Sequence, residues 1–443
     1  MTIRPNGSGP LPEHPRAHRR DLAVQAAVKD GLLDPDRAPL AAFLDLAGIR
    51  AAARELHRAW PAELPVLHAF AAKANSMVPV LRLLREQGLG CEVASPGELD
   101  RALAAGFDPA GIVLDSPVKT RAELARALGL GIAVNIDNFQ ELERVDALRP
   151  DRPGGSGQGG SRLGVRINPQ VGTGSIEAMS TAGRSTKFGI PLTDPGSRER
   201  LLAAYADRPW LRWVHVHVGS QGCPLELTAA GVAAAVAFAQ EVDRNRPGQI
   251  EGIDVGGGLA VDFDGDADRA GFDDHVAALR AAAPALFDGR YRIVTEFGRA
   301  LLAKNGFLAS RVEYTKTAGG RPIALTHAGA QVATRTVFAP AAWPLRVLAY
   351  DRDGRPSTAA PAVQDVAGPC CFAGDLLARG RELPLLAEGD LVVVPDTGAY
   401  YFSTHFDYNS LPEPPVHAFE VAADGSVDFT PLRPAGHCAT LEA

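Results

Sequence analysis

The chain has 443 residues, of which 46% are hydrophobic and 22% are charged, and its formal net charge is −7. This composition is typical of a globular protein with a large core, and the length favours two domains. The mild charge shows no basic patch of the kind that binds nucleic acid, and five scattered cysteines suit neither a disulfide framework nor a zinc site.

The N-terminal segment 1–40 lacks the apolar run and cleavage site of a secretory signal, so we expect a cytoplasmic protein. Whether this segment contributes to a later β domain is left open. The longest uncharged apolar stretch, 229–239, is shorter than the roughly 18 residues that span a bilayer. It predicts a buried helix and no membrane partner.

From about residue 62 to 300 the chain alternates short β-branched runs with loops and helical stretches, and we place the barrel domain at residues 41–310. Between the first two runs, apolar residues recur at helical spacing, at Met77, Val80, Leu81 and Leu84. Such alternation indicates a parallel sheet, and eight units are the number that closes a (β/α)8 barrel. The eight candidate strands cover residues 66–73, 90–95, 111–116, 132–137, 163–169, 213–219, 252–258 and 292–298.

Two segments depart from this alternation. The Gly-rich stretch 149–162 has no apolar positions to bury, and it predicts a mobile surface loop between the fourth helix and the fifth strand. Residues 311–443 contain β-like runs at 321–329, 344–350 and 390–401, separated by Gly, Pro and Asp clusters. We therefore predict that a mostly antiparallel β domain over 311–443 follows the barrel.

Lys73 follows the first candidate strand and lies between alanines. The C-terminal strand ends of a (β/α)8 barrel meet at one mouth, so polar residues there are functional candidates. A lysine in this place could simply extend its ammonium group from the rim into solvent. In an apolar pocket its pKa would instead fall, and its neutral amine could form a Schiff base.

Polar and glycine residues also follow the last two strands. Gly256 to Gly258 could bring backbone N–H groups to a phosphate, since the loops after strands seven and eight are the usual phosphate site of this barrel. A plain tight turn is the alternative. Glu296 and Arg299 could form an ion pair at the rim, or Glu296 could pair with the ring nitrogen of pyridoxal phosphate.

Two histidines, His215 and His217, lie two residues apart in the sixth candidate strand. We expect them to point to opposite faces, one towards the mouth and the other towards the helices. Together, a lysine, a glycine triplet, a glutamate and a histidine on four strand ends are consistent with a pyridoxal phosphate site.

Ten short motifs support a family resemblance: AAKANS, EVASPGEL, RINP, TKFGI, HVHVGSQ, DVGGG, EFGR, GPCCFAGD, DTGAY and YNS. In order and spacing they resemble those of the fold-type III pyridoxal phosphate decarboxylases, the group of diaminopimelate, ornithine and arginine decarboxylases. Over about residues 40–420, the chain is most similar to the diaminopimelate branch. The resemblance implies an alanine-racemase-like barrel, the cofactor pyridoxal 5'-phosphate and an amino-acid substrate.

The resemblance also implies roles for individual residues. Lys73 would form an aldimine with the cofactor, His217 would stack on its ring, and Cys371 would return a proton to a quinonoid intermediate. In this family the cysteine loop reaches into the barrel of a partner subunit, which implies a homodimer. The cofactor would be held by Lys73, Glu92, Arg166, His217, Ser220, Gly256, Gly257, Gly258, Glu296, Gly298, Arg299 and Tyr400. The substrate would contact Arg299, Arg335, Phe372 and Tyr400.

The chain departs from the diaminopimelate branch next to the cysteine. That branch continues with Glu-Ser, and the glutamate reads the distal amino group of the substrate, whereas this chain has Phe372 and Ala373. An apolar ring cannot compensate a buried ammonium group. Arg299 and Arg335 remain available for a distal carboxylate, and Glu92 replaces an aspartate. We therefore expect a substrate other than diaminopimelate.

The leading hypothesis is a pyridoxal phosphate-dependent amino-acid decarboxylase. One alternative is a racemase or epimerase with the same cofactor, and another is a catalytically silent homologue with a binding role. A carboxylate at Glu296 argues against the racemases of this barrel class, which generally place an arginine at the ring nitrogen. The presence of Lys73, Cys371 and the glycine triplet argues against a silent homologue.

Overall fold

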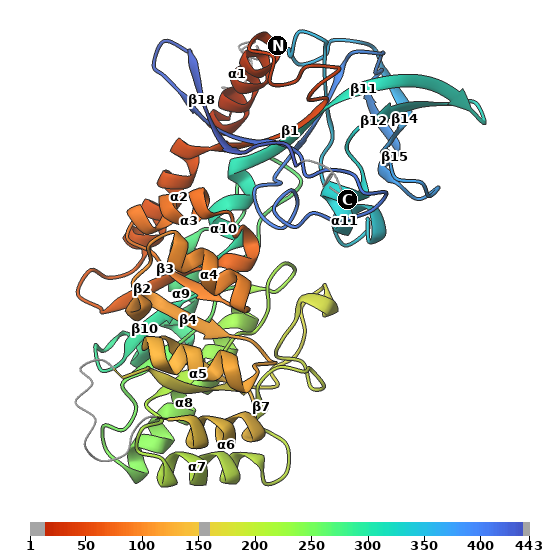
Figure 1. Cartoon of the computed structure of the whole chain (residues 1–443). Coiled ribbons are helices and arrows are strands. Elements are labelled where there is room, and N and C mark those ends of the chain that lie inside the picture. The colour runs from red at the N-terminus through yellow and green to blue at the C-terminus, as the bar shows by residue number, and fades with distance from the viewer. Residues whose placement is uncertain (1–13, 150–159, 437–443) are drawn as a thin grey trace, which may run out of the picture. The chain divides into compact units, whose positions relative to one another are not determined.

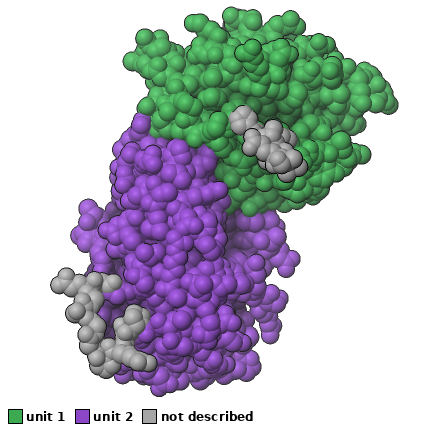
Figure 2. Space-filling view, viewed as in Figure 1, with its two compact units in different colours: residues 1–48, 262–268, 304–443 green, residues 49–261, 269–303 purple. Residues whose placement is uncertain are grey.

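The computed structural model describes residues 14–149 and 160–436. The chain divides into two compact units, coloured separately in Figure 2. Unit 1 comprises residues 1–48, 262–268 and 304–443, and unit 2 comprises residues 49–261 and 269–303. The Gly-rich loop predicted over 149–162 falls largely on residues 150–159, which lie outside the described residues.

Unit 2 is a closed parallel barrel, as predicted (Figure 1). Its strands are β2 (Val66–Ala71), β3 (Gly90–Val93), β4 (Ile112–Asp115), β5 (Ala133–Ile136), β6 (Leu163–Asn168), β8 (Trp213–His215), β9 (Gly252–Asp254) and β10 (Arg292–Thr295). The two-residue strand β7 (Ile190–Pro191) pairs with β6 outside the barrel. Pairing of β5 with β6, and of β10 with β2, closes the ring. Each predicted strand is present, and each ends one to four residues earlier than expected.

The helices of unit 2 follow the strands in the βα order. They are α2 (Leu46–Ala59), α3 (Val78–Glu86), α4 (Pro96–Ala104), α5 (Arg121–Leu130), α6 (Phe139–Leu148), α7 (Ser197–Asp207), α8 (Leu225–Asn245), α9 (Phe272–Ala282) and α10 (Arg299–Leu302). Three of them begin after a side chain that accepts the N–H of a glutamate three residues on, in the pairs Ser95–Glu98, Thr120–Glu123 and Asn138–Glu141. These caps satisfy N–H groups that would otherwise lack partners, and they fix where each helix starts.

Helix α8 contains the apolar stretch that we predicted to be a buried helix. The helix has 21 residues, longer than that stretch, and its length and composition would suit a membrane span. Its buried residues include Val232, Ala235 and Ala239, at helical spacing on one face. The helix connects β8 to β9 and packs against both strands, so its apolar face is buried against the barrel.

Unit 1 is a mixed sheet that takes strands from both ends of the chain. Its strands are β1 (Leu40–Asp45), β11 (Gly306–Ala318), β12 (Arg321–Thr326), β13 (Leu348–Tyr350), β14 (Pro361–Ala367), β15 (Leu376–Pro384), β16 (Leu391–Pro395), β17 (Val416–Val421) and β18 (Val427–Arg433). The pairs β1–β17 and β12–β14 are parallel, and the other pairs are antiparallel. The predicted β domain is therefore present, with two helices, α1 (Pro15–Lys29) and α11 (Ala330–Phe338), in the same unit.

The border between the units differs from the predicted one. Strand β1 pairs with β11 and β17, so residues 40–45 belong to the β unit, whereas we had placed residue 41 onwards in the barrel. Helix α1 packs on the same sheet through Ala23, Val24 and Ala27, which lie in its apolar core. The N-terminal segment thus contributes both a helix and a central strand to unit 1.

Candidate active site

Lys73 lies at the C-terminal end of β2, within a short 3-10 turn. Its side chain is 40% exposed, and Nζ donates a hydrogen bond of 2.5 Å to Oε2 of Glu92. Glu92 comes from β3 and its side chain is fully buried. Burial raises the pKa of Glu92 to about 8, although the Lys73 ammonium group works in the opposite direction. The raised pKa makes Glu92 a stronger base beside the Lys73 amine.

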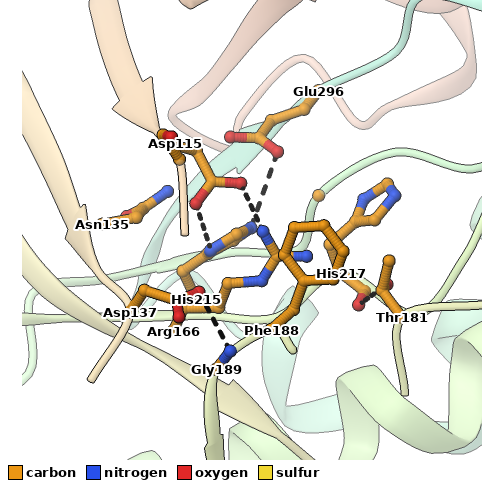
Figure 3. Close-up of polar contacts among 12 residues, drawn as sticks. Asp115, Asn135, Asp137, Arg166, Thr181, Phe188, Gly189, His215, His217 and Glu296 are labelled. Atoms are coloured by element: carbon orange, nitrogen blue, oxygen red, sulfur yellow. Dashed lines mark hydrogen bonds and ion pairs between the residues drawn. The ribbon is translucent and has the colours of Figure 1, made fainter. Parts of the chain in front are cut away.

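Three ionisable side chains converge beside this pair, as Figure 3 shows. The imidazole of His215 lies 3.5 Å from Oε2 of Glu296 and 3.7 Å from Oδ1 of Asp115. All three side chains are buried, and they come from β8, the end of β10 and β4. The potential ligand atoms of the three residues lie within 4.8 Å of one another.

The positive charge on His215 offsets the repulsion among the carboxylates of this cluster. Burial lowers the pKa of His215, but the carboxylates of Asp115, Asp254 and Glu296 outweigh burial and raise it to about 9. In return, the imidazolium lowers the pKa of Glu296 against the effect of burial. The three side chains therefore form a buried network of paired charges.

Arg166, on β6, is engaged within this network. Its Nη1 donates to Oδ2 of Asp115 at 2.8 Å, and its guanidinium group stacks on Phe188, 4.4 Å from the ring centroid. The combined attraction of Arg166 and His215 lowers the pKa of Asp115 despite the opposing effect of burial. Arg166 therefore stabilises the charges beneath the barrel mouth, and its recorded contacts are with protein groups.

Both histidines of the sixth predicted strand lie on the inner side of the barrel, which corrects the expectation of opposite faces. Residues two apart in a strand share a face, and His217 follows directly where β8 ends at His215. Nδ1 of His217 accepts a hydrogen bond of 3.1 Å from the backbone N–H of Gly257. Burial and the nearby cations Arg166 and Lys73 lower the pKa of His217 to about 3, so its ring is neutral.

The glycine triplet is packed too tightly to accept side chains. Gly256 and Gly258 have positive φ angles of 67° and 114°. A Cβ atom on Gly257 would lie 2.1 Å from the carbonyl oxygen of Glu296, and one on Gly258 would lie 2.1 Å from that of Gly219. The triplet is thus a shaped loop whose backbone closely approaches the segment containing Gly219 and Ser220.

The loop after β10 is equally close-packed. Gly298 approaches the end of β2 and the turn after it, because a Cβ atom there would lie 3.2 Å from the side chain of Ala71 and 2.9 Å from that of Ala74. Arg299 follows as the first residue of α10 and is only 3% exposed. The predicted residues Lys73, Gly298 and Arg299 therefore lie at the same end of the barrel.

In unit 1, the two adjacent cysteines differ in environment. Cys371 is exposed, and its backbone N–H donates to Oδ1 of Asn409 at 2.9 Å. Cys370 is 6% exposed, and its backbone N–H donates to Oδ2 of Asp375 at 2.7 Å. Burial and the Asp375 carboxylate raise the pKa of the Cys370 thiol to about 11. Only Cys371 therefore presents its thiol to solvent.

Phe372 belongs to a cluster of four aromatic rings, hereafter the aromatic cluster. Its ring stacks on Phe338 with centroids 5.3 Å apart and an interplanar angle of 8°. Tyr408 and Phe406 complete the set, with edge contacts to Phe372 and Phe338, respectively. Phe338 is 58% exposed, so the aromatic cluster presents apolar surface beside the exposed Cys371.

Arg335 lies on the same helix as Phe338 and contacts two aromatic rings. Its guanidinium carbon is 5.0 Å from the ring centroid of Trp343 and 4.7 Å from that of Tyr400. Its Nη1 atom is buried without a hydrogen-bond partner among the described residues. Tyr400 has a positive φ of 66°, a strained conformation for a tyrosine. These contacts hold a guanidinium donor in place for an acceptor.

Sequence reasoning missed Asp115, Asp254 and Trp343, and it gave His215 no role of its own. Asp115 is the last residue of an apolar barrel strand, and the rule that polar residues at strand ends are functional candidates could have found it. Asp254 ends β9 in the same way, and burial raises its pKa well above the usual value. Nothing in the sequence pairs Trp343 with Arg335.

Comparisons with known proteins support the family resemblance. A family model described as "Pyridoxal-dependent decarboxylase, pyridoxal binding domain" matches residues 47–303. Diaminopimelate decarboxylase from Methanothermobacter thermautotrophicus is 31% identical over 392 residues, which cover 87% of each chain. The enzyme of the same name from Pseudomonas aeruginosa is 34% identical over 372 residues, covering 82% of this chain and 83% of that one.

Solved structures share the same architecture. Helicobacter pylori diaminopimelate decarboxylase, complexed with L-lysine, matches with a TM-score of 0.78 and 26% identity, covering 92% of this chain and 96% of that chain. The M. jannaschii enzyme matches with a TM-score of 0.80 at 23% identity, a likeness of fold. The predicted barrel, β domain and pyridoxal cofactor are thereby confirmed.

Proposed function

The chain belongs to the pyridoxal-dependent decarboxylases, and from this premise we propose that it decarboxylates an amino acid other than diaminopimelate. The observation that carries the proposal is Phe372, whose ring packs against Phe338 in the aromatic cluster. We propose that the distal part of the substrate contacts these rings and therefore carries no ammonium group there, because an unpaired buried charge is costly.

The residues of unit 2 fit the cofactor pyridoxal phosphate. The loop of Gly256 to Gly258 has no room for Cβ atoms, as expected where a backbone approaches a phosphate group. Oε1 of Glu296 is buried and has no hydrogen-bond partner among the described residues, so it can accept one from a ring nitrogen. Neutral His217 offers an uncharged ring for stacking. We propose that Ser220, Gly298 and Arg299 contribute to the same site, and the family resemblance assigns Tyr400 a further contact with the cofactor.

When bound, pyridoxal phosphate supplies a conjugated ring that accepts the electron pair left by a departing carboxyl group. Lys73 would hold the cofactor through its amine, and Glu92, which accepts a hydrogen bond of 2.5 Å from Nζ, would orient that amine. Glu296, kept ionised by His215, would favour a protonated ring nitrogen. These residues together would lower the barrier to loss of carbon dioxide.

Cys371 would return the proton to the α-carbon, since it is the thiol of the pair that reaches solvent. We propose that it does so in a cytoplasmic homodimer, serving the barrel of its partner. Mixing Lys73→Ala and Cys371→Ala subunits tests this arrangement. If each site takes the lysine and the cysteine from different subunits, reassociated mixtures should recover about a quarter of wild-type activity, because half the dimers then have one intact site. No recovery in mixtures that have demonstrably exchanged subunits would refute the shared site.

Arg335 supports a substrate with a distal carboxylate. Its Nη1 atom has no hydrogen-bond partner in residues 14–149 and 160–436, and a guanidinium group binds a carboxylate with high geometric specificity. A second candidate is diaminopimelate itself, because both curated relatives described above bear the name of that activity. The two candidates differ only in whether the distal carbon carries an amino group beside Phe372.

Diaminopimelate and 2-aminopimelate are therefore a matched pair of test substrates, identical except for the distal amino group. We expect the holoenzyme to release carbon dioxide from 2-aminopimelate with the higher kcat/KM. The Phe372→Glu variant should reverse this preference by roughly tenfold or more, since it restores an acceptor for the ammonium group. Faster turnover of diaminopimelate by the wild-type protein would refute the proposed specificity while leaving the decarboxylase assignment intact.

A further inference from the structure

Asp254 is buried inside the barrel of unit 2, and its carboxyl group links the glycine triplet to another strand. It is the last residue of β9, which pairs with β8 and β10. Its Oδ1 atom accepts the backbone N–H of Gly256 at 3.0 Å, and its Oδ2 atom accepts Nδ2 of Asn135 at 3.1 Å. Asn135 is also buried and lies in β5, whose barrel partners are β4 and β6. The second hydrogen bond therefore crosses the barrel interior.

The hydrogen bond from Gly256 closes a tight turn at the end of β9. An aspartate oxygen that accepts the N–H two residues further along the chain holds the backbone in place of a backbone turn. Gly256 has a positive φ of 67° in this turn, and a Cβ atom there would lie 2.7 Å from Nδ1 of His217. Oδ1 accepts the N–H whether or not the carboxyl group carries a proton, so the turn does not depend on the charge of Asp254.

The N–H groups of the three glycines differ in their partners. That of Gly256 donates to Asp254, and that of Gly257 donates to Nδ1 of His217 at 3.1 Å. Both of these glycines are buried, whereas Gly258 is partly exposed. In the described part of the chain, the N–H of Gly258 has no hydrogen-bond acceptor. The first two glycines therefore shape the loop, and the third presents its N–H to an anion.

Asn135 is itself held in place by a buried lysine. Its backbone carbonyl oxygen accepts a hydrogen bond of 2.9 Å from Nζ of Lys119. The Lys119 side chain is fully buried and forms an ion pair of 2.8 Å with Glu141. Because both the backbone and the side chain of Asn135 are bonded, it provides a fixed support for the carboxyl group of Asp254.

We propose that Asp254 is a positioning residue that fixes the glycine loop for the phosphate group of the cofactor, and that Asn135 positions Asp254 from across the barrel interior. This inference rests on the proposed function, because it requires the loop to bind the phosphate. It assigns the N–H of Gly258 as the donor of the triplet to that phosphate. Neither Asp254 nor Asn135 contacts the cofactor in this arrangement.

Pyridoxal 5'-phosphate and pyridoxal are matched probes of this role, since they differ only in the phosphate group. Fluorescence titration of the apoprotein gives a dissociation constant for each, and the wild-type protein should prefer the phosphorylated probe. Asp254→Ala should reduce this preference by roughly tenfold or more, because the N–H of Gly256 loses its acceptor and the loop can move. Asp254→Asn should retain most of the preference, because the amide oxygen still accepts that N–H.

The outcomes separate this inference from the proposed function. If Asp254→Ala weakens both probes equally, or neither, the positioning role is overturned while the cofactor site stands. If the wild-type protein binds no pyridoxal 5'-phosphate, the proposed function is refuted and this inference falls with it.

Asp243→Ala is the control for a general loss of stability. Asp243 lies in helix α8 and is buried, and its Oδ1 atom accepts the N–H of Ile250 at 2.9 Å, before β9 begins. Its removal also leaves a buried N–H without an acceptor, but at the other end of the strand from Asp254. The preference for the phosphorylated probe should therefore be unchanged. An equal loss of preference in Asp243→Ala and Asp254→Ala would overturn the positioning role.

A second pair of variants tests the proposal independently, even if Asp254→Ala does not fold. Asn135→Asp places two carboxyl groups against each other and should lower the preference for the phosphorylated probe. Adding Asp254→Asn restores one donor and one acceptor, so the double variant should recover most of that preference. A double variant no better than Asn135→Asp alone would overturn the link between Asn135 and Asp254.

Discussion

His215 and Glu296 form a buried imidazolium–carboxylate pair, with Nε2 and Oε2 3.5 Å apart. Neither residue contacts solvent, so each depends on the other for its charge. The imidazolium lowers the pKa of Glu296, while Glu296 together with Asp115 and Asp254 raises that of His215. In the proposed site, His215 would therefore set the negative charge that Glu296 offers to the ring nitrogen of the cofactor, without contacting the cofactor itself.

Replacing His215 by Gln should weaken binding of pyridoxal phosphate. Without the imidazolium, burial and Asp115 raise the pKa of Glu296, and its ability to pair with a protonated ring falls. We expect the dissociation constant to rise roughly tenfold, which corresponds to about 1.4 kcal/mol. Fluorescence titration of the apoprotein with cofactor measures this change.

His275→Gln is the control for this experiment. His275 is 2% exposed, and burial alone lowers its pKa to about 4, so the side chain is neutral. Its replacement should leave cofactor affinity close to that of the wild type. An unchanged dissociation constant in His215→Gln would contradict the electrostatic role.

The same pair predicts a loss of stability at alkaline pH. The pKa of His215 is about 9 in the folded chain, above the usual value of 6.5. Its stabilising contribution is therefore complete below about pH 6.5 and is lost as the pH rises through 9. In the wild-type protein, protonated His215 contributes on the order of 3 kcal/mol to the free energy of unfolding.

Thermal unfolding between pH 6 and pH 10 measures this loss. The melting temperature of the wild-type protein should fall towards that of His215→Gln as the pH passes 9. Glu92 titrates in both proteins, so its contribution cancels in the comparison. If the difference in melting temperature between the wild type and His215→Gln is unchanged at pH 10, the charge on His215 is not its cause.

The two adjacent cysteines should differ both in their effect on kcat and in the reactivity of their thiols. Cys371→Ala should lower kcat by about 10²-fold or more, the usual contribution of a general acid, whereas Cys370→Ala should leave kcat nearly unchanged. Iodoacetamide should label exposed Cys371 and spare buried Cys370, whose pKa is raised to about 11. Peptide mass spectrometry reads the labelling, and preferential modification of Cys370 would reverse the proposed assignment.

Gly257→Ala should abolish cofactor retention. A Cβ atom there would lie 2.1 Å from the carbonyl oxygen of Glu296, so the backbone must shift at both residues. Gly129→Ala is the control, because no atom lies within 4 Å of its added methyl group and the residue is in helix α5. The control should be slightly stabilised, by about 0.5–1 kcal/mol. Gel filtration followed by absorbance measures the cofactor retained, and normal retention by Gly257→Ala would contradict the tight packing.

The eight barrel strands were predictable because buried parallel strands are apolar runs followed by glycine and polar residues. Their ends were predicted too late, since residues such as His217 and Gly258 leave the hydrogen-bond ladder and form loops at the mouth. The same rule would have identified Asp115. The charge relationship between His215 and Glu296 was out of reach, because it depends on strands more than 75 residues apart in the chain.

The assignment of β1 to the sheet of unit 1 could not be inferred from sequence periodicity. The segment is apolar like the barrel strands and directly precedes them, but Leu40 pairs with Ser310 and Ala42 pairs with Val416. A strand's partners depend on tertiary packing, and local sequence does not encode a partner hundreds of residues away. The sequence-based border at residue 41 followed from this missing information.

The position of β1 between β11 and β17 also constrains the order of events during synthesis. The strand leaves the ribosome among the first 45 residues, yet its parallel partner begins at Val416. The barrel strands, by contrast, pair mostly with neighbours made shortly before them. An apolar strand must therefore stay unpaired while most of the polypeptide is translated, which exposes it to non-native association. We therefore expect unit 1 to complete its sheet only after the barrel strands have been made.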